Sequence, residues 1–316
     1  MNDVLRLLAK LLRRYGYDIK RHYEYNLLPI ANLSKINQLS PLYATGQQNT
    51  APGTDSSFDK LFICLRTCLR NHNEKRKPPN VAGVDRYELV SRCMRSVIRS
   101  INYAVEKKTG GTINLVVFDD HSDERFIKSF EDICRNSKCR WEIRTTHEYG
   151  QGQSLLEQFE FARGSNGLFY FCEDDYLHEV SAVAEMVVFY EQIFRTCRTH
   201  LVIHPQEHEF LYSRTIYPSY LLLGENRHWR TISHATHVLF THSKIISDHW
   251  QYFENTRFVG DKKKRRLGSE AKTTDLLFNH IPGFAPIPSL AAHMQTESCL
   301  PPFFNWRPLW DRNGPG

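Results

Sequence analysis

The sequence has no apolar run long enough to cross a bilayer. A membrane-spanning helix needs roughly 18 consecutive apolar residues, and no run among the 316 residues approaches that length. A secretory signal is also lacking in residues 1–20, because charged side chains are scattered among their apolar positions. We therefore expect a cytoplasmic protein, whose membrane contact, if it has one, is peripheral and on the cytoplasmic face.

The eight cysteines lack the Cys-x-x-Cys spacing that zinc and redox sites use. Several lie inside apolar runs, where cysteine behaves as a small buried hydrophobe, so we expect reduced thiols and no disulfide framework. The chain also lacks internal repeats, low-complexity segments and nucleic-acid-binding motifs. Its net charge of +6 fits an anionic ligand and does not by itself indicate nucleic-acid binding, so no nucleic-acid partner is expected.

Apolar strands that alternate with amphipathic helices dominate the rest of the chain. Near-continuous apolar runs at 61–65, 113–118 and 168–172 predict buried strands, and apolar residues at helical spacing follow them. Hydrophobic residues make up 41% of the chain, which is enough for a substantial core. This alternation predicts an α/β fold with a mostly parallel sheet covered by helices on both faces.

The remaining elements are predicted from shorter patterns. We expect weaker strands at 141–145, 201–204 and 236–240, and helices at 86–107, 125–134, 154–163, 181–194 and 243–253. Residues 261–271 are expected to form a basic polar loop. Five prolines within 281–302 predict an extended tail that wraps the domain.

The N-terminal part differs in composition from the rest. Leucines and a valine share a broad face of residues 4–14, with lysine and arginine around it, which predicts a basic amphipathic helix. Such a helix could lie on an anionic membrane surface, or pack on its own domain or a partner chain. Residues 15–57 are rich in Asn, Ser, Gln, Pro and Gly. We therefore predict an N-terminal extension over 1–58 and one α/β domain over 59–316.

Three consecutive carboxylates, Glu173, Asp174 and Asp175, follow the apolar run at 168–172. Like charges side by side at the end of a core strand are costly unless a cation or hydrogen-bond donors face them. Ligands bind at the carboxyl ends of strands in open α/β sheets. We interpret the cluster as a site for a divalent metal that holds a nucleotide diphosphate. A helix cap is the simpler alternative, but one acid would suffice for it.

A second apolar run, 113–118, leads into Asp119 and Asp120 as VVFDDHSD. This segment resembles the VVDDGSTD motif of family 2 glycosyltransferases. FYFCEDDYLH, about 50 residues later, resembles the aspartate-rich metal motif of that family, in the Glu-Asp-Asp form also seen in N-acetylglucosaminyltransferases of the GT-A superfold. The resemblance covers roughly residues 59–293. It implies a GT-A-type, Rossmann-like domain over 59–316.

The resemblance implies an activity and a set of ligands. The activity would be a metal-dependent, inverting transfer of a sugar from a nucleotide diphosphate-sugar, with a UDP-sugar favoured, to a hydroxyl of a glycan or glycolipid. Surface polysaccharide or glycolipid synthesis is the expected setting. Six residues are expected at the nucleotide sugar: Arg66, Thr67, Asp119, Asp120, Glu173 and Asp174.

The metal would be Mn²⁺ or Mg²⁺, which neutralises the charge that develops on the leaving diphosphate. The resemblance makes Asp175 its direct ligand and His293 a second one, with His280 as the alternative histidine. Without the resemblance, a lone histidine is more often structural than a ligand.

An inverting transfer also needs a general base, which the family places at the start of a late helix. Asp275 in KTTDLLFNH matches that position, and Glu270 is the second candidate. Asp275 could instead be a first-turn acid favoured by the helix dipole. Trp229 is expected on the acceptor side as a stacking surface for a sugar, with a place in the core as the alternative.

The sequence departs from the family at three points. His121 replaces a glycine, Glu173 stands where aspartate is commoner, and Arg66 and Thr67 replace a proline-containing strand end. These departures leave the donor open. Rival functions are a sugar-phosphate nucleotidyltransferase, which would need a glycine-rich loop that LFICLRTCLRN lacks, and an inactive binding or scaffold protein of the same fold.

Two further patterns have simpler explanations. His204, Glu207 and His208 spell the HxxEH pattern of some zinc peptidases, but that pattern needs a helix, and Pro205 follows His204 directly. The basic run KKKRR at 262–266 is typical of a solvated loop. In a GT-A fold such a loop could close over the donor phosphates.

Overall fold

The computed structural model describes residues 12, 58–70, 80–213, 219–224 and 226–314 of the chain. The predicted N-terminal helix and linker lie outside these residues, apart from Leu12 and Phe58. Within the described part no helix combines the length and the apolar character that crossing a membrane would require.

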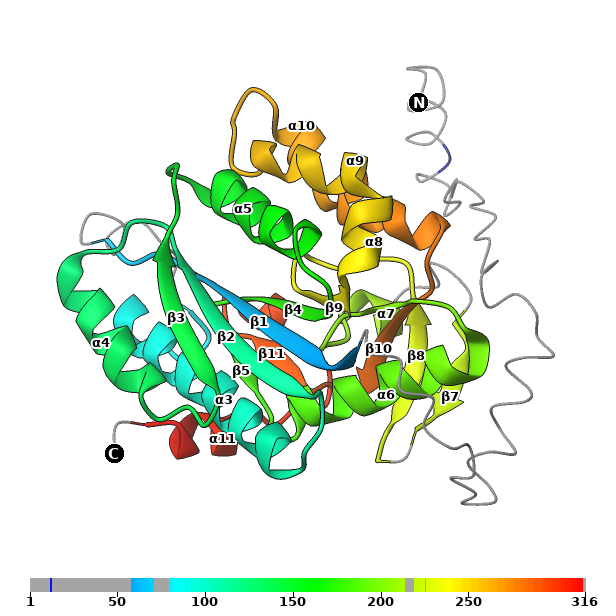
Figure 1. Cartoon of the computed structure of the whole chain (residues 1–316), viewed down its shortest axis with the longest axis horizontal. Coiled ribbons are helices and arrows are strands. Elements are labelled where there is room, and N and C mark those ends of the chain that lie inside the picture. The colour runs from blue at the N-terminus through cyan, green and yellow to red at the C-terminus, as the bar shows by residue number, and fades with distance from the viewer. Residues whose placement is uncertain (1–11, 13–57, 71–79, 214–218, 225, 315–316) are drawn as a thin grey trace.

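A nine-stranded mixed sheet forms the centre of the molecule, in the order β3-β2-β1-β4-β9-β6-β10-β8-β7 (Figure 1). Its strands are β1 (Lys60–Thr67), β2 (Thr112–Asp119), β3 (Arg140–Thr145), β4 (Leu168–Glu173), β6 (Val202–Ile203), β7 (Leu221–Leu223), β8 (His228–Ile232), β9 (Leu239–His242) and β10 (Gly283–Ile287). Only β8 and β9 run against the other seven, since their pairings are antiparallel. The prediction of a mostly parallel sheet is therefore confirmed.

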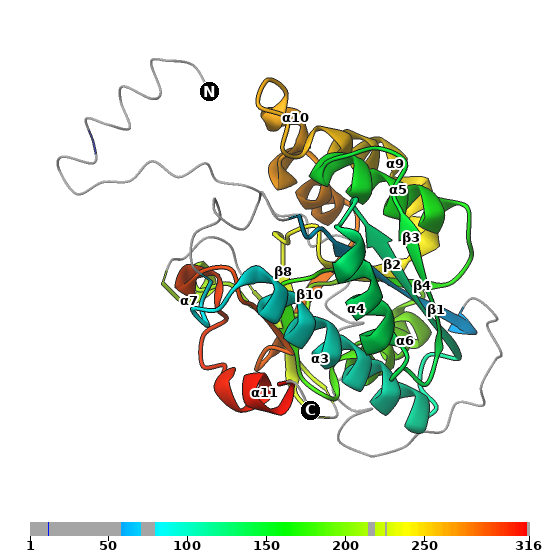
Figure 2. The same ribbon diagram turned by 90° about the vertical axis from the view of Figure 1, so that its left-hand side faces the viewer.

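Helices cover both faces of the sheet, as predicted. The α-helices are α3 (Arg86–Glu106), α4 (Glu124–Cys134), α5 (Gln151–Arg163), α6 (Ala182–Cys197), α7 (Phe210–Ser213), α8 (Ser243–Asp248), α9 (Trp250–Phe253), α10 (Arg265–Gly268) and α11 (Arg307–Arg312). Short 3₁₀ helices are η3 (Glu254–Phe258), η4 (Glu270–Lys272), η5 (Thr274–Asn279) and η6 (Glu297–Cys299). Figures 1 and 2 show α3, α4 and α6 on one face of the sheet and α5, α8 and α9 on the other.

Alternate residues of the central strands supply the two cores. Ile63 of β1 faces α3, α4 and α6 in the larger core, whereas Cys64 faces α5, α8 and α9 in the second. Strands buried on both faces become continuous apolar runs, which is why the sequence pattern predicted them. The helix α3 begins after Asp85, whose carboxylate accepts a hydrogen bond from the Glu88 amide at 2.8 Å.

The predicted proline-rich tail at 281–302 is wrong in part. Its first half is β10, which pairs with β6 and β8 inside the sheet, and Ala291–His293 form β11, which pairs with β5 (Tyr176–His178). Pro286 is tolerated in β10 because β6 pairs only with Gly283 and Phe284. The predicted helix at 243–253 is split between α8 and α9, and the expected basic loop at 261–271 contains α10 and η4.

The side chain of His178 gives the core a dependence on pH. It is fully buried, with Nε2 at 2.6 Å from the Tyr170 hydroxyl and Nδ1 at 2.9 Å from the Tyr176 carbonyl. A neutral ring satisfies both contacts, with Nδ1–H donating to the carbonyl. Burial lowers the pKa of His178 to about 4.

Acidification from pH 6.5 to 4 is therefore expected to destabilise the protein. An unfolded chain takes up a proton on His178 in that window and the folded chain does not, so this residue contributes a loss of about 3 kcal/mol. Urea unfolding at several pH values checks the loss. His178→Gln should flatten the dependence, and an unchanged slope in that variant would contradict the assignment.

Candidate metal and nucleotide site

The parallel register of β1, β2 and β4 brings the predicted residues to one edge of the sheet. Thr67 pairs with Asp119 across β1 and β2, and Arg66 pairs with Glu173 across β1 and β4. Because the three strands end at the same level, the acids of the two sequence motifs lie on neighbouring strand ends. The apolar runs predicted that these acids end strands, whereas their gathering at one site was implied by the resemblance.

Glu173 and Asp174 are held by donors from β1 and the residues after it. The Arg66 Nη2 group donates to Glu173 Oε1 at 2.7 Å. The Thr67 hydroxyl and the Cys68 amide donate to Asp174 Oδ2, at 3.0 and 3.3 Å. Asp174 is 2% exposed, so these contacts replace the water that its carboxylate loses on burial.

A second arginine bridges the two aspartates. Arg86, the first residue of α3, donates through Nη2 to Asp174 Oδ1 and through Nη1 to Asp175 Oδ2, the latter at 3.3 Å. The sequence analysis did not single out Arg86. The hydrogen-bond donors that the three acids require thus come largely from two arginines, whose guanidinium groups meet all three carboxylates.

One carboxylate oxygen of the cluster has an ion pair but no hydrogen bond. Asp175 Oδ1 is buried without a hydrogen-bond partner among the described residues, and His293 Nε2 lies 3.4 Å from it. One ligand atom from each of Glu173, Asp175 and His293 lies within 4.8 Å of the others. Two carboxylates and an imidazole suit a divalent cation. The residues present therefore fit a metal ion.

Asp175 and His293 each alter the ionisation of the other. Burial opposes the charge of Asp175, but His293, Arg86 and Arg66 outweigh it and lower the pKa of Asp175. Burial likewise lowers the pKa of His293, but Asp175 reverses the effect and raises it to about 10. Contact with His293 in turn lowers the pKa of the Cys299 thiol to about 7.

The acids after β2 are engaged by their own loop. Asp119 accepts hydrogen bonds from the amide and hydroxyl of Ser122, and burial raises the pKa of Asp119. Asp120 Oδ1 accepts from Arg70 Nη2 at 2.7 Å and from the Gly150 amide at 3.0 Å. Both carboxylates lie at the strand end next to Thr67, whose carbonyl accepts from the Asp120 amide at 2.8 Å.

His121, which replaces a glycine of the motif that VVFDDHSD resembles, adopts a left-handed conformation with φ of +55°. The imidazole ring of His121 stacks on Tyr149 with 3.6 Å between the ring centroids. The guanidinium carbon of Arg70 also lies over the Tyr149 ring, 4.9 Å from its centroid. The turn therefore keeps the geometry that glycine normally provides. The histidine adds an aromatic pair beside Asp120.

The predicted general base is paired with a histidine. Asp275, in η5, lies with Oδ2 at 2.7 Å from His234 Nδ1 and accepts at Oδ1 from the Ala235 amide at 3.1 Å. The second candidate, Glu270, lies 3.9 Å from Nδ1 of the buried His237. His234 was not predicted; of the residues near it, only Trp229 was expected on the acceptor side. Nothing in the sequence around His234 indicates that it pairs with Asp275, 41 residues later.

Tyr176 connects the acid cluster to this histidine segment. Its ring stacks on His293 with 4.6 Å between centroids, and its hydroxyl lies 3.2 Å from the Thr236 hydroxyl. Thr236 lies two residues after His234, the partner of Asp275. Tyr176 therefore links the acid cluster to the segment whose histidine pairs with the predicted base.

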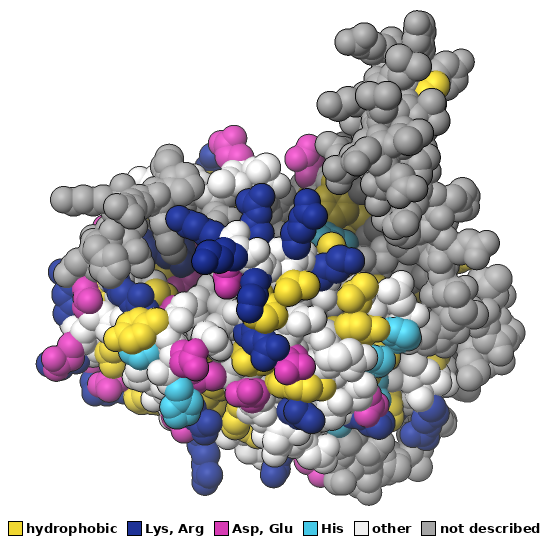
Figure 3. Space-filling model, turned by 90° about the horizontal axis from the view of Figure 1, so that it is seen from above, with side chains coloured by type: hydrophobic (Ala, Val, Ile, Leu, Met, Phe, Trp, Pro, Cys, Tyr) yellow, Lys and Arg dark blue, Asp and Glu magenta, His cyan; other side chains and the backbone are white. Residues whose placement is uncertain are grey.

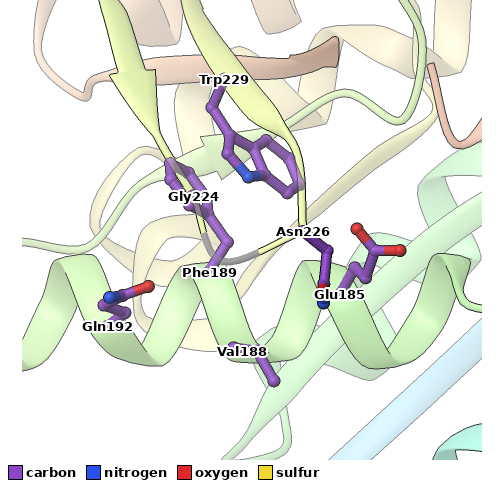
Figure 4. A pocket seen from close by; sticks show the side chains of 7 residues that line it. All are labelled: Glu185, Val188, Phe189, Gln192, Gly224, Asn226 and Trp229. Carbon is purple, nitrogen blue, oxygen red and sulfur yellow. The ribbon is translucent and has the colours of Figure 1, made fainter. Parts of the chain in front are cut away.

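Trp229 occupies the core. It is 2% exposed, and its ring stacks on Phe189 with 4.0 Å between centroids. A small pocket beside it is lined by α6 and the β7–β8 connection and includes none of the acid-cluster residues (Figure 4). The structure thus favours the core alternative, because a buried indole leaves no face for a sugar.

The other patterns do not join the cluster. His280 lies at 3.1 Å from the Tyr252 hydroxyl and stacks on His249, away from Asp175. His204 contacts the Val238 carbonyl at 2.7 Å, and Glu207 accepts from Arg230 at 3.1 Å, on a segment that forms no helix there. The residues of the basic run at 262–266 are exposed. Figure 3 shows lysine and arginine side chains gathered on the face seen from above, the side on which α10 lies.

No protein-family model matches the chain, and no curated protein matches it. Among solved structures, it is similar to TarS of S. aureus, with 12% identity and a TM-score of 0.41 over 72% of this chain and 36% of TarS. The chain spans 36% to 60% of the length of the TarS structures that it matches. Other structures of TarS contain UDP or UDP-GlcNAc.

Two further solved structures are similar over most of this chain. The mannosyltransferase PcManGT of Pyrobaculum calidifontis, in complex with GDP-Man and Mn²⁺, is 10% identical, with a TM-score of 0.38 over 68% of this chain and 53% of that one. A UDP-glucose pyrophosphorylase in complex with UDP-glucose is 11% identical, with a TM-score of 0.40 over 80% and 97% of the two chains. These neighbours are glycosyltransferases and a nucleotidyltransferase.

Proposed function

We propose that the chain is a metal-dependent, inverting glycosyltransferase that uses a nucleotide diphosphate-sugar. The proposal depends above all on one observation. One ligand atom from each of Glu173, Asp175 and His293 lies within 4.8 Å of the others, and Tyr176, which stacks on His293, contacts the segment of His234, the partner of Asp275.

On the donor side, Asp175 and His293 would hold Mn²⁺ or Mg²⁺, with Glu173 beside them. The metal would neutralise the charge that builds up on the departing diphosphate. The strand ends that carry Thr67 and Asp119 would bind the nucleoside, since they adjoin the acid cluster. A UDP-sugar is the donor that we propose.

On the acceptor side, the Asp275–His234 pair would remove the proton of the attacking hydroxyl. With Nδ1 held by Asp275 at 2.7 Å, the ring of His234 presents Nε2 as its second nitrogen. This arrangement resembles the way in which a carboxylate orients a catalytic imidazole elsewhere. The acceptor that we propose is a glycan or glycolipid, used in surface polysaccharide or glycolipid synthesis on the cytoplasmic side of a membrane.

Calorimetric titration of UDP, GDP and CDP, each with and without Mn²⁺, tests the donor side. We expect one nucleotide to bind only when the metal is present, and its base identifies the donor. Binding that ignores the metal would contradict the metal-dependent site. If none of the three binds to folded protein, the glycosyltransferase proposal fails and a scaffold of the same fold takes its place. Pyrophosphate-dependent release of a nucleoside triphosphate from a nucleotide sugar would instead identify a nucleotidyltransferase.

A further inference from the structure

The guanidinium of Arg86 occupies an unfavourable place for a cation. It belongs to the first residue of α3, and the N-terminus of a helix carries a partial positive charge that disfavours cations. Its side chain is 14% exposed, and its Nε has no hydrogen-bond partner among the described residues. The compensating contacts are those with Asp174 and Asp175.

Arg86 and a metal ion would share one carboxylate. Arg86 takes Oδ2 of Asp175, and the oxygen available to a metal, Oδ1, belongs to the same group. A guanidinium and a divalent cation on the two oxygens of one carboxylate repel each other strongly, because little water separates them. Arg86 therefore weakens metal binding as long as it remains on the aspartates.

We propose that Arg86 makes metal binding conditional on the nucleotide, by occupying Asp174 and Asp175 in the free protein and moving to the donor's diphosphate when the donor binds. The inference rests on the proposed function, because it takes a nucleotide diphosphate as the ligand. A diphosphate suits this exchange, since guanidinium pairs with phosphate oxygens as well as with carboxylates. The exchange removes a competing cation from Asp175. It couples the two ligands, and the coupling is reciprocal.

The charges of the cluster favour such an exchange. Three carboxylates face two guanidiniums, those of Arg66 and Arg86. Arg66 is fixed on Glu173 from the neighbouring strand. Arg86, by contrast, extends from the end of a helix, and both of its aspartates have other partners. Asp174 also accepts hydrogen bonds from Thr67 and Cys68, and Asp175 also has an ion pair with His293. Asp174 keeps two donors when Arg86 leaves.

Electron paramagnetic resonance of free Mn²⁺, without nucleotide, tests the inference. Arg86→Met and Arg86→Gln remove the charge, and both are expected to bind Mn²⁺ on the order of tenfold more tightly than the wild type, or better. Arg86→Lys keeps the charge and should stay close to the wild type. Arg99→Met, on the exposed side of α3, is the matched control and should not change the affinity.

The second measurement repeats the titrations with saturating UDP. In the wild type, UDP should tighten Mn²⁺ binding on the order of tenfold, whereas in Arg86→Met the gain should be much smaller. Mn²⁺ should also raise the melting temperature of Arg86→Met more than that of the wild type, because the metal takes over the role of the missing guanidinium. This readout does not depend on activity.

The results separate the inference from the proposed function. If Arg86→Met and Arg86→Gln fold but bind Mn²⁺ no more tightly than the wild type, the inference is overturned even where UDP binds. If neither variant folds, the wild type decides, because equal Mn²⁺ affinity with and without bound UDP would overturn it. If none of UDP, GDP and CDP binds to the wild type or to any variant, the proposed function fails. Tighter Mn²⁺ binding by Arg86→Met and Arg86→Gln would in that case still show that Arg86 competes with the metal.

Discussion

Asp175→Asn is expected to abolish metal-dependent nucleotide binding while leaving the protein folded. The change removes the charge of Asp175, whose Oδ1 is buried without a hydrogen bond among the described residues, and a neutral amide is a poor ligand for Mn²⁺. We expect at least a hundredfold loss of Mn²⁺-dependent UDP affinity, and a comparable loss of transfer activity, because the leaving diphosphate would lose its neutralising ion. Calorimetry and an assay of UDP release measure the two effects.

Asp174→Asn is the informative comparison, because the neighbouring acid is used differently. Both of its oxygens already accept hydrogen bonds, from Thr67, Cys68 and Arg86, and it is 2% exposed. Breaking a buried, paired charge costs about 3–5 kcal/mol. We therefore expect Asp174→Asn to lower the free energy of unfolding more than Asp175→Asn does. Equal loss of Mn²⁺ affinity in the two variants would contradict the distinct roles assigned to the two acids.

The parts of the site that the sequence predicted are those that follow from strand geometry. A continuous apolar run predicts a buried strand, and acids directly after it must lie at the strand end. Parallel pairing of β1 with β2 and β4 then brings Thr67, Asp119 and Glu173 together. Each step uses local sequence and a general rule of sheets. The same reasoning predicted the α/β fold and its helices on both faces.

The parts that could not be predicted depend on contacts between distant segments. Arg86 lies 88 residues before Asp174, and His234 lies 41 residues before Asp275. No periodicity connects such pairs. Arg66 was expected at the nucleotide sugar, a role that remains a prediction. Its contact with Glu173 depends on the pairing of β1 with β4, which the sequence does not specify. The role of Trp229 was mispredicted for another reason. A tryptophan in a polar stretch has the same sequence pattern whether it binds a ligand or lies in the core.

The short strands near the C-terminus were mispredicted for a related reason. Prolines normally argue against a strand inside a sheet, and 281–302 contains five of them. The neighbouring β6 is only two residues long, so most of β10 needs no partner on that side. The length of β6 is known only from the folded sheet. The sequence of β10 alone therefore does not show that its prolines are tolerated.

Asp275→Asn is expected to lower kcat by about 10²- to 10⁴-fold without changing the affinity for nucleotide and metal, because the role that we propose for the pair is removal of the proton of the acceptor hydroxyl. His234→Gln should lower kcat by a similar factor. If the two side chains work as a unit, the double variant should be little worse than either single one. Asp248→Asn, in the exposed pair with Lys244 on α8, is the control. A larger loss in Glu270→Gln than in Asp275→Asn would move the base to Glu270.

The pH profile distinguishes a base from a residue that only holds the loop. Burial lowers the pKa of His234, but the bond and charge of Asp275 outweigh it and raise the pKa above its usual 6.5. Since a base must be unprotonated, kcat should fall as the pH drops through this raised value, which places the acid limb above pH 6.5. In Asp275→Asn the hydrogen bond to a carboxylate and its charge are gone, while burial and the smaller raising influence of Glu270 remain, so the limb should shift to lower pH along with the loss in rate. An acid limb that stays in place in the variant would mean that His234 does not take the proton, and the base would then be a carboxylate acting directly.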